Sequence, residues 1–125
     1  MKPVNQKIYG RTVKNRDDGD CLRGALASIL EKKVEDIPHF AKQFKGQLCW
    51  QAFNLYLSQY NKVASFIFGD EHAPNKYYIA AYSVKASRRV CHAVVWRNGK
   101  VVHDPNPRKP MLDKLLYLIS IDKLK

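Results

Sequence analysis

The first third of the chain carries a helical pattern of hydrophobic positions. Over residues 21–32, apolar side chains recur at spacings of three and four, which places them on one helix face. These positions are Leu22, Ala25, Leu26, Ile29 and Leu30. A polar, glycine-containing loop is predicted over residues 10–20. Asp20 ends that loop and is placed to act as the N-cap, accepting hydrogen bonds from the first-turn N–H groups.

A second helical pattern follows over residues 47–60. Its apolar stripe is predicted from similar spacings and consists of Leu48, Cys49, Ala52, Leu55 and Tyr56. Between the two helices, residues 34–38 predict a short turn that ends at Pro38.

From residue 63 the pattern changes to β-branched and aromatic runs bounded by turn residues, which predicts strands. The predicted strands are residues 63–68, 77–83, 91–97, 100–103 and 116–121. Asn98-Gly99 between two of them is typical of a type I′ hairpin. Helices therefore come first and an antiparallel sheet second, which predicts an α+β fold with N-terminal helices packed on a C-terminal sheet.

The composition fits one folded domain. The chain has 125 residues, of which 46% are hydrophobic, and no repeat or linker divides it. We therefore predict a single domain over residues 1–125. Three cysteines without framework spacing indicate a reducing compartment, and residues 1–11 lack the apolar stretch of a signal peptide. No apolar run is long enough to span a membrane. A cytoplasmic location is expected.

The charge balance is strongly basic. Twenty-two Lys and Arg face eleven Asp and Glu, giving a formal net charge of +11. Such a field attracts nucleic acid, an acidic protein or an anionic substrate, although a merely solvated basic surface is an equal alternative. No C-x-x-C or H-x-x-x-H spacing and no phosphate-binding glycine motif occur, so neither a metal nor another cofactor is expected.

Cys21 is the candidate nucleophile. It opens the first predicted helix, where the helix dipole and free N–H groups favour a thiolate and can receive an oxyanion. The carboxylates of Asp17, Asp18 and Asp20 oppose this effect unless they are paired or point away. The alternative is a buried cysteine that acts only as a small hydrophobic residue.

His92 and Asp104 are the candidate partners of Cys21. His92 leads a β-branched strand, which would hold a general base rigidly. Counting outward from the Asn98-Gly99 turn pairs Val94 with His103 and Ala93 with Asp104. His92 then lies diagonally beside Asp104, within reach after a small irregularity. The alternatives are a strand-end histidine bonded to a carbonyl and a turn aspartate before proline.

The order of Cys21, His92 and Asp104 along the chain, with the residues around them, resembles that of a known family. The stretches GDCLRGALASIL, VEDIPHF, CHAVVW and KVVHDPNP resemble the small papain-like cysteine peptidase-like proteins of bacteria and their phages, over residues 15–107. The resemblance implies a papain-like fold and acyl transfer through Cys21, His92 and Asp104. It also implies that the amide of Asn15, six residues before the nucleophile, helps to form the oxyanion hole.

Basic residues surround the candidate site in sequence. We expect a positive rim from four of them: Arg16, Arg23, Arg88 and Arg89. The expected substrate is a peptide, an isopeptide or a small amide, with an anionic group as one option. Two alternatives stay open. One is a catalytically silent papain-like protein that binds a host protein, and the other is a nucleic-acid-binding protein, for which no motif is present.

Overall fold

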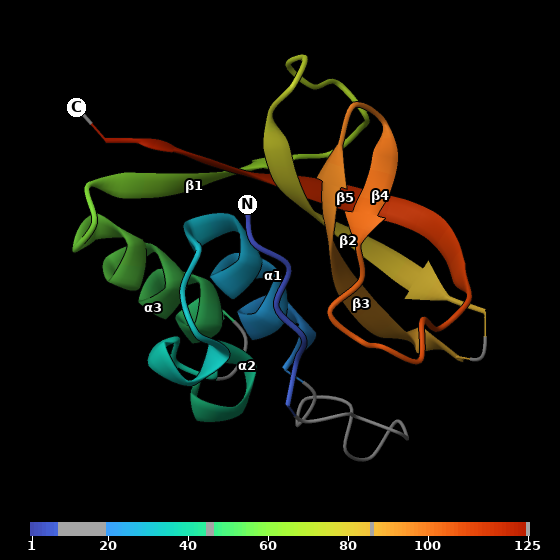
Figure 1. Cartoon of the computed structure of the whole chain (residues 1–125), viewed down its shortest axis with the longest axis horizontal. Coiled ribbons are helices and arrows are strands. Elements are labelled where there is room, and N and C mark those ends of the chain that lie inside the picture. Colours follow the sequence, from blue (N-terminus) through green and yellow to red (C-terminus); the bar gives the residue numbers. More distant parts are fainter. Residues whose placement is uncertain (8–19, 45–46, 86, 125) are drawn as a thin grey trace.

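The computed structural model describes residues 1–7, 20–44, 47–85 and 87–124. Two helices, α1 (Cys21–Leu30) and α3 (Gln47–Ser58), pack against a five-stranded antiparallel sheet (Figure 1). The short elements η2 (Val34–Asp36) and α2 (Phe40–Gln43) connect them. The α+β prediction is confirmed. Helices long and apolar enough to cross a bilayer are absent from these described ranges.

The five strands lie where the sequence predicts strands, within a few residues at most ends. They are β1 (Lys62–Ile67), β2 (Tyr77–Val84), β3 (Ser87–Arg97), β4 (Lys100–His103) and β5 (Leu112–Lys123). Their order in the sheet is β1-β5-β2-β3-β4, so the last strand of the chain lies between the first two. Asn98 and Gly99 both have positive φ, 53° and 81°, as a type I′ turn requires.

The side chains of β3 divide between two cores. Ala93 and Val95 face the helices, whereas Val94 and Trp96 belong to a second cluster on the opposite face of the sheet. This alternation agrees with the sequence pattern. His92 comes directly before Ala93 on β3 and is buried.

The predicted face of the second helix is wrong in part. Leu48 and Leu55 are 59% and 71% exposed, and neither belongs to the core. The residues of α3 that are buried are Cys49, Phe53, Tyr56 and Leu57. Successive buried residues lie four, three and one positions apart, so they share one face of the helix. Phe53 rather than Leu55 completes that face.

The N-terminal segment, residues 1–7, joins α1 to the end of β4 (Figure 1). The Lys2 N–H donates to the Ser28 carbonyl at 3.0 Å, and the buried Ser28 hydroxyl accepts from the Val4 N–H at 2.9 Å. On its other side, the Gln6 N–H donates to the Pro105 carbonyl at 2.8 Å. The segment thereby fixes the residue after Asp104 relative to the helix that begins at Cys21.

Candidate active site

Cys21 is the first residue of α1, and its sulfur reaches the edge of the sheet. The backbone N–H of Ala93 donates to the Cys21 sulfur at 3.3 Å. This N–H is available because β4 ends at His103, which pairs with Val95. In an antiparallel strand the N–H groups of alternate residues point to the same neighbour, so Ala93 lacks the strand partner that Val95 has. The end of β4 thus opens a place for the thiol.

His92 and Asp104 form a buried ion pair beside this thiol. The Nε2 of His92 lies 2.6 Å from Oδ1 of Asp104, and their side chains are only 7% and 8% exposed. The same Oδ1 accepts the N–H of Asn106 at 2.9 Å, which holds the carboxylate in place. Because Nε2 is engaged, Nδ1 is the ring nitrogen that remains for Cys21.

The irregularity in the hairpin lies at Val102. The predicted pairs Arg97–Lys100 and Trp96–Val101 are correct, but Val95 rather than Val94 is paired with His103. The extra residue is a β-bulge, a feature that re-aims side chains and ends strand pairing. The bulge changes the register predicted for Asp104, while its carboxylate still meets His92.

The His92 imidazole is held in its protonated form. Burial alone would lower the pKa of His92, but hydrogen bonds to Asp104 and Cys21 and the charges of both groups raise it to about 9. The imidazolium therefore lies between the Asp104 carboxylate and the Cys21 sulfur. A cysteine beside a protonated imidazole is the arrangement in which thiolate, the nucleophilic form, is stabilised.

Asp20 does not cap α1 through its side chain, so that detail of the sequence prediction is wrong. Its fully buried carboxylate accepts the Lys7 N–H at 3.0 and 3.1 Å and pairs with Arg23 at 3.4 Å. The negative charge next to Cys21 is therefore compensated. The Arg23 Nε–H also donates to the Ile37 carbonyl at 2.6 Å. Arg23 lies near the site, but its guanidinium is committed to these internal contacts.

Some predicted site residues lie beyond what the structure describes. Asn15 and Arg16 fall in residues 8–19, outside the described residues, together with Asp17 and Asp18. Arg88 and Arg89 belong to β3, and their side chains also lie outside the description. The oxyanion role of Asn15 and the basic rim stay predictions.

The other two cysteines differ from each other. Cys49 is buried on α3, as predicted, whereas Cys91 on β3 is exposed. Desolvation of its sulfur and the nearby charge of Cys21 still raise the pKa of Cys91 to about 11.

Within the described ranges, no three His, Cys, Asp or Glu side chains gather in a group that could hold a metal ion.

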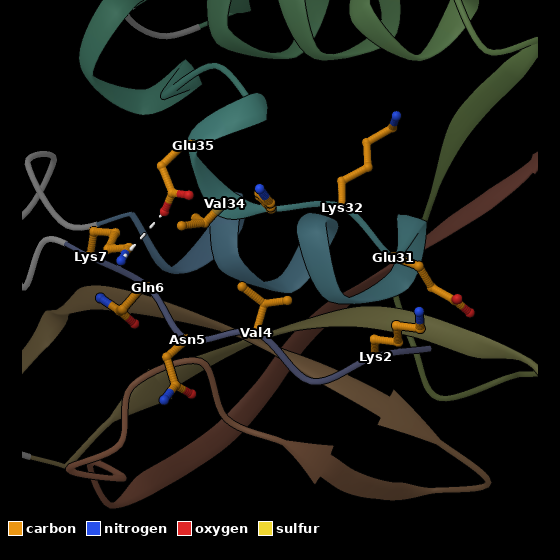
Figure 2. Close-up of a pocket in the computed structure, with 10 residues that line it drawn as sticks. Lys2, Val4, Asn5, Gln6, Lys7, Glu31, Lys32, Val34 and Glu35 are labelled. Atoms are coloured by element: carbon orange, nitrogen blue, oxygen red, sulfur yellow. Dashed lines mark ion pairs between the residues drawn. The ribbon is translucent and has the colours of Figure 1, made fainter.

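One pocket of the described structure is lined by none of Cys21, His92 and Asp104. It lies between the N-terminal segment and the chain from Glu31 to Glu35, and Figure 2 shows Lys7 and Glu35 facing each other across it, with Nζ and Oε1 3.4 Å apart. Gln6, only 5% exposed, lies on its floor between α1 and Pro105. The sequence analysis missed Gln6 because seven residues without periodicity give no signal for such packing.

Comparison with known proteins adds no assignment. No family model, no curated protein and no solved structure matches this chain.

Proposed function

We propose that this protein is a papain-like cysteine hydrolase that cleaves amide or isopeptide bonds through a thioester intermediate. The observation that carries the proposal is one geometry: a thiol at a helix N-terminus beside a buried histidine, whose Nε2 lies 2.6 Å from a buried carboxylate. Nucleophile, base and orienting group each meet the chemical requirement of their role. We also propose that it is a cytoplasmic enzyme of a bacterium or phage and that it requires no cofactor.

The reaction begins with attack by the Cys21 thiolate on the carbonyl carbon. A C–S bond forms, and the carbonyl electron pair moves onto oxygen. The first-turn N–H groups of α1 stabilise this oxyanion, and the proposal keeps Asn15 as a further donor. When the oxyanion collapses, the C–N bond breaks and His92 donates its Nδ1 proton to the leaving amine.

Hydrolysis of the thioester uses the same groups in reverse. Neutral His92 accepts a proton from water, and the hydroxyl attacks the thioester carbonyl. The C–S bond then breaks, which releases the carboxylic acid and restores the thiolate–imidazolium pair. Asp104 stays ionised throughout and keeps the imidazole ring aligned.

An activated ester tests this proposal without knowledge of the natural substrate. We expect p-nitrophenyl acetate to give a burst of about one p-nitrophenolate per protein, with the acetyl group mapped to Cys21 by mass spectrometry. Cys21→Ser should abolish the rapid burst, and Cys91→Ser, the matched control, should retain it. Equal acylation of wild type and Cys21→Ser would contradict the proposal and favour a protein that only binds its partner.

A further inference from the structure

A second thiol lies on the strand that contacts the candidate nucleophile. The Cys21 sulfur accepts the N–H of Ala93, and Cys91 lies two residues before Ala93 on β3. Side chains two positions apart in a strand point to the same face of the sheet, so Cys91 shares the helix-facing side with Ala93. Two strand residues span about 6.6 Å, so the two sulfur atoms need to approach by a few ångströms before they can bond.

The backbone around Cys91 permits this approach. The described β4 ends at His103, opposite Val95, and does not extend as far as Cys91. On the other side of β3, pairing with β2 is regular up to Ser83–Cys91 and shifts beyond it. Such an irregularity interrupts the ladder and lets a strand bend. Cys91 therefore lies at the end of the regular ladder rather than in its middle.

The charges of the cysteines also place the two sulfur atoms near each other. Desolvation of its sulfur raises the pKa of Cys91 to about 11, and negative charge at Cys21 is the second cause. Burial, followed by the charges of Cys91, Cys21 and Cys49, raises the pKa of Tyr117 to about 12. Charges shift a pKa in this way over a few ångströms, which agrees with the strand geometry.

We propose that Cys21 and Cys91 form a reversible disulfide when a hydroperoxide oxidises Cys21, and that this bond switches the candidate active site off. The inference rests on the proposed function, because it requires a reactive thiolate at Cys21. That thiolate attacks a peroxide oxygen, the O–O bond breaks, and Cys21 becomes a sulfenic acid. Cys91 loses its proton and its sulfur attacks the Cys21 sulfur. The S–O bond then breaks, and the departing hydroxide takes up a proton to become water.

The electrons and atoms of this sequence balance. Two thiols and one hydrogen peroxide give one disulfide and two water molecules. Oxidation also removes the negative charge of Cys21, which is one of the two causes of the raised pKa of Cys91. Cys91 therefore becomes more acidic, and so a better nucleophile at neutral pH, after Cys21 has been oxidised.

A disulfide of this kind protects the nucleophile as well as blocking it. Without a second thiol, a sulfenic acid is oxidised further to sulfinic acid, which dithiols do not reduce. A disulfide is reversed by exchange with a dithiol, and disulfides of a reducing compartment are usually transient. Cys49 is a poorer partner for Cys21, because it is buried on α3.

Peroxide treatment of the reduced full chain tests the disulfide. We expect wild type to lose the mass of two hydrogen atoms, with the bond mapped to Cys21–Cys91 by mass spectrometry of peptides. Labelling of Cys21 by iodoacetamide should fall at least about tenfold and recover after dithiothreitol. In Cys91→Ser, Cys21 should instead gain two or three oxygen atoms, and dithiothreitol should not restore its labelling. Cys49→Ala, the matched control, should behave as wild type.

Alkylation of the reduced protein separates this inference from the proposed function. If reduced Cys21 is labelled rapidly at pH 6 but gains oxygen atoms equally in wild type and Cys91→Ser, the disulfide is overturned and the thiol chemistry survives. A disulfide that joins two chains through Cys91 overturns it in the same way. If reduced Cys21 is labelled no faster than Cys91 and peroxide leaves it unchanged, the proposed function and the disulfide fail together.

Discussion

At the scale of single residues, the site depends on how His92 is surrounded. Its ring is buried, which favours the neutral form, yet it is bonded to Asp104 on one side and faces Cys21 on the other. The second effect prevails, because a buried cation with anionic neighbours interacts through a medium of low dielectric constant. These contacts make a proton on His92 part of the folded structure.

This coupling predicts a pH dependence of stability. The pKa of His92 is about 9 in the folded protein and 6.5 without the fold, so the folded state binds the proton more tightly. The resulting stabilisation is complete below pH 6.5 and is lost as the pH rises through 9. Urea unfolding of wild type and His92→Ala should show a stability difference that shrinks by on the order of 3 kcal/mol between pH 6.5 and pH 9.5. The same difference at both pH values would contradict the proposed pair.

At the scale of elements, the contact between α1 and the loop after β4 aligns the site. Gly24 of α1 faces Pro105, and a Cβ built on Gly24 would lie 2.8 Å from the Pro105 Cβ and 3.2 Å from the Gln6 nitrogen. The helix that positions Cys21 therefore touches the loop that positions Asp104, with no room for a methyl group between them. A glycine is needed here for close approach.

Gly24→Ala tests whether this contact aligns the site. Alanine normally stabilises a helix by up to about 1 kcal/mol relative to glycine, but here overpacking should cost about 1–3 kcal/mol. Displacement of Pro105 should also move Asp104 and slow the alkylation of Cys21 at pH 6. Gly69→Ala is the control, since nothing lies within 4 Å of its added Cβ. Urea unfolding and alkylation rates measure both effects; a stabilised Gly24→Ala variant with normal alkylation would show that the contact is not required.

The strands and the hairpin could be predicted because their signals are local. β-branched runs and Asn98-Gly99 specify β3 and β4 without reference to the rest of the chain. The position of β5 between β1 and β2 depends on contacts distant in sequence, and the bulge at Val102 depends on how the hairpin ends. The roles of Gln6 and Ser28 were missed for the same reason, since both act by packing against distant residues.

At the scale of the whole molecule, the charge of +11 stands apart from the site chemistry. Of the described ion pairs, Lys7–Glu35 is largely exposed and Lys76–Asp122 is partly exposed, and surface pairs of this kind contribute little to stability. Arg23, the basic residue described next to Cys21, is committed to Asp20 and Ile37. We expect the net charge to act as a repulsive field that opposes compaction.

Salt should accordingly stabilise the protein. Screening shortens the range of repulsion to about 8 Å at physiological ionic strength, so we expect the melting temperature to rise by a few degrees from low salt to 300 mM sodium chloride. Calorimetry or circular dichroism measures this directly. A melting temperature that falls with salt would mean that attractive ion pairs outweigh the net repulsion.

The central claim is that Cys21 and His92 form a thiolate–imidazolium pair, and the most direct test is alkylation of Cys21 by iodoacetamide as a function of pH. Intact mass and peptide mapping would follow each cysteine in wild type, in His92→Ala and in His72→Ala, whose histidine is exposed and serves as the control. We predict rapid alkylation of Cys21 at pH 6 in wild type and His72→Ala, and loss of this reactivity in His92→Ala, because only the thiolate reacts. Slow alkylation of Cys21 at pH 6, or a rate unaffected by His92→Ala, would contradict the account.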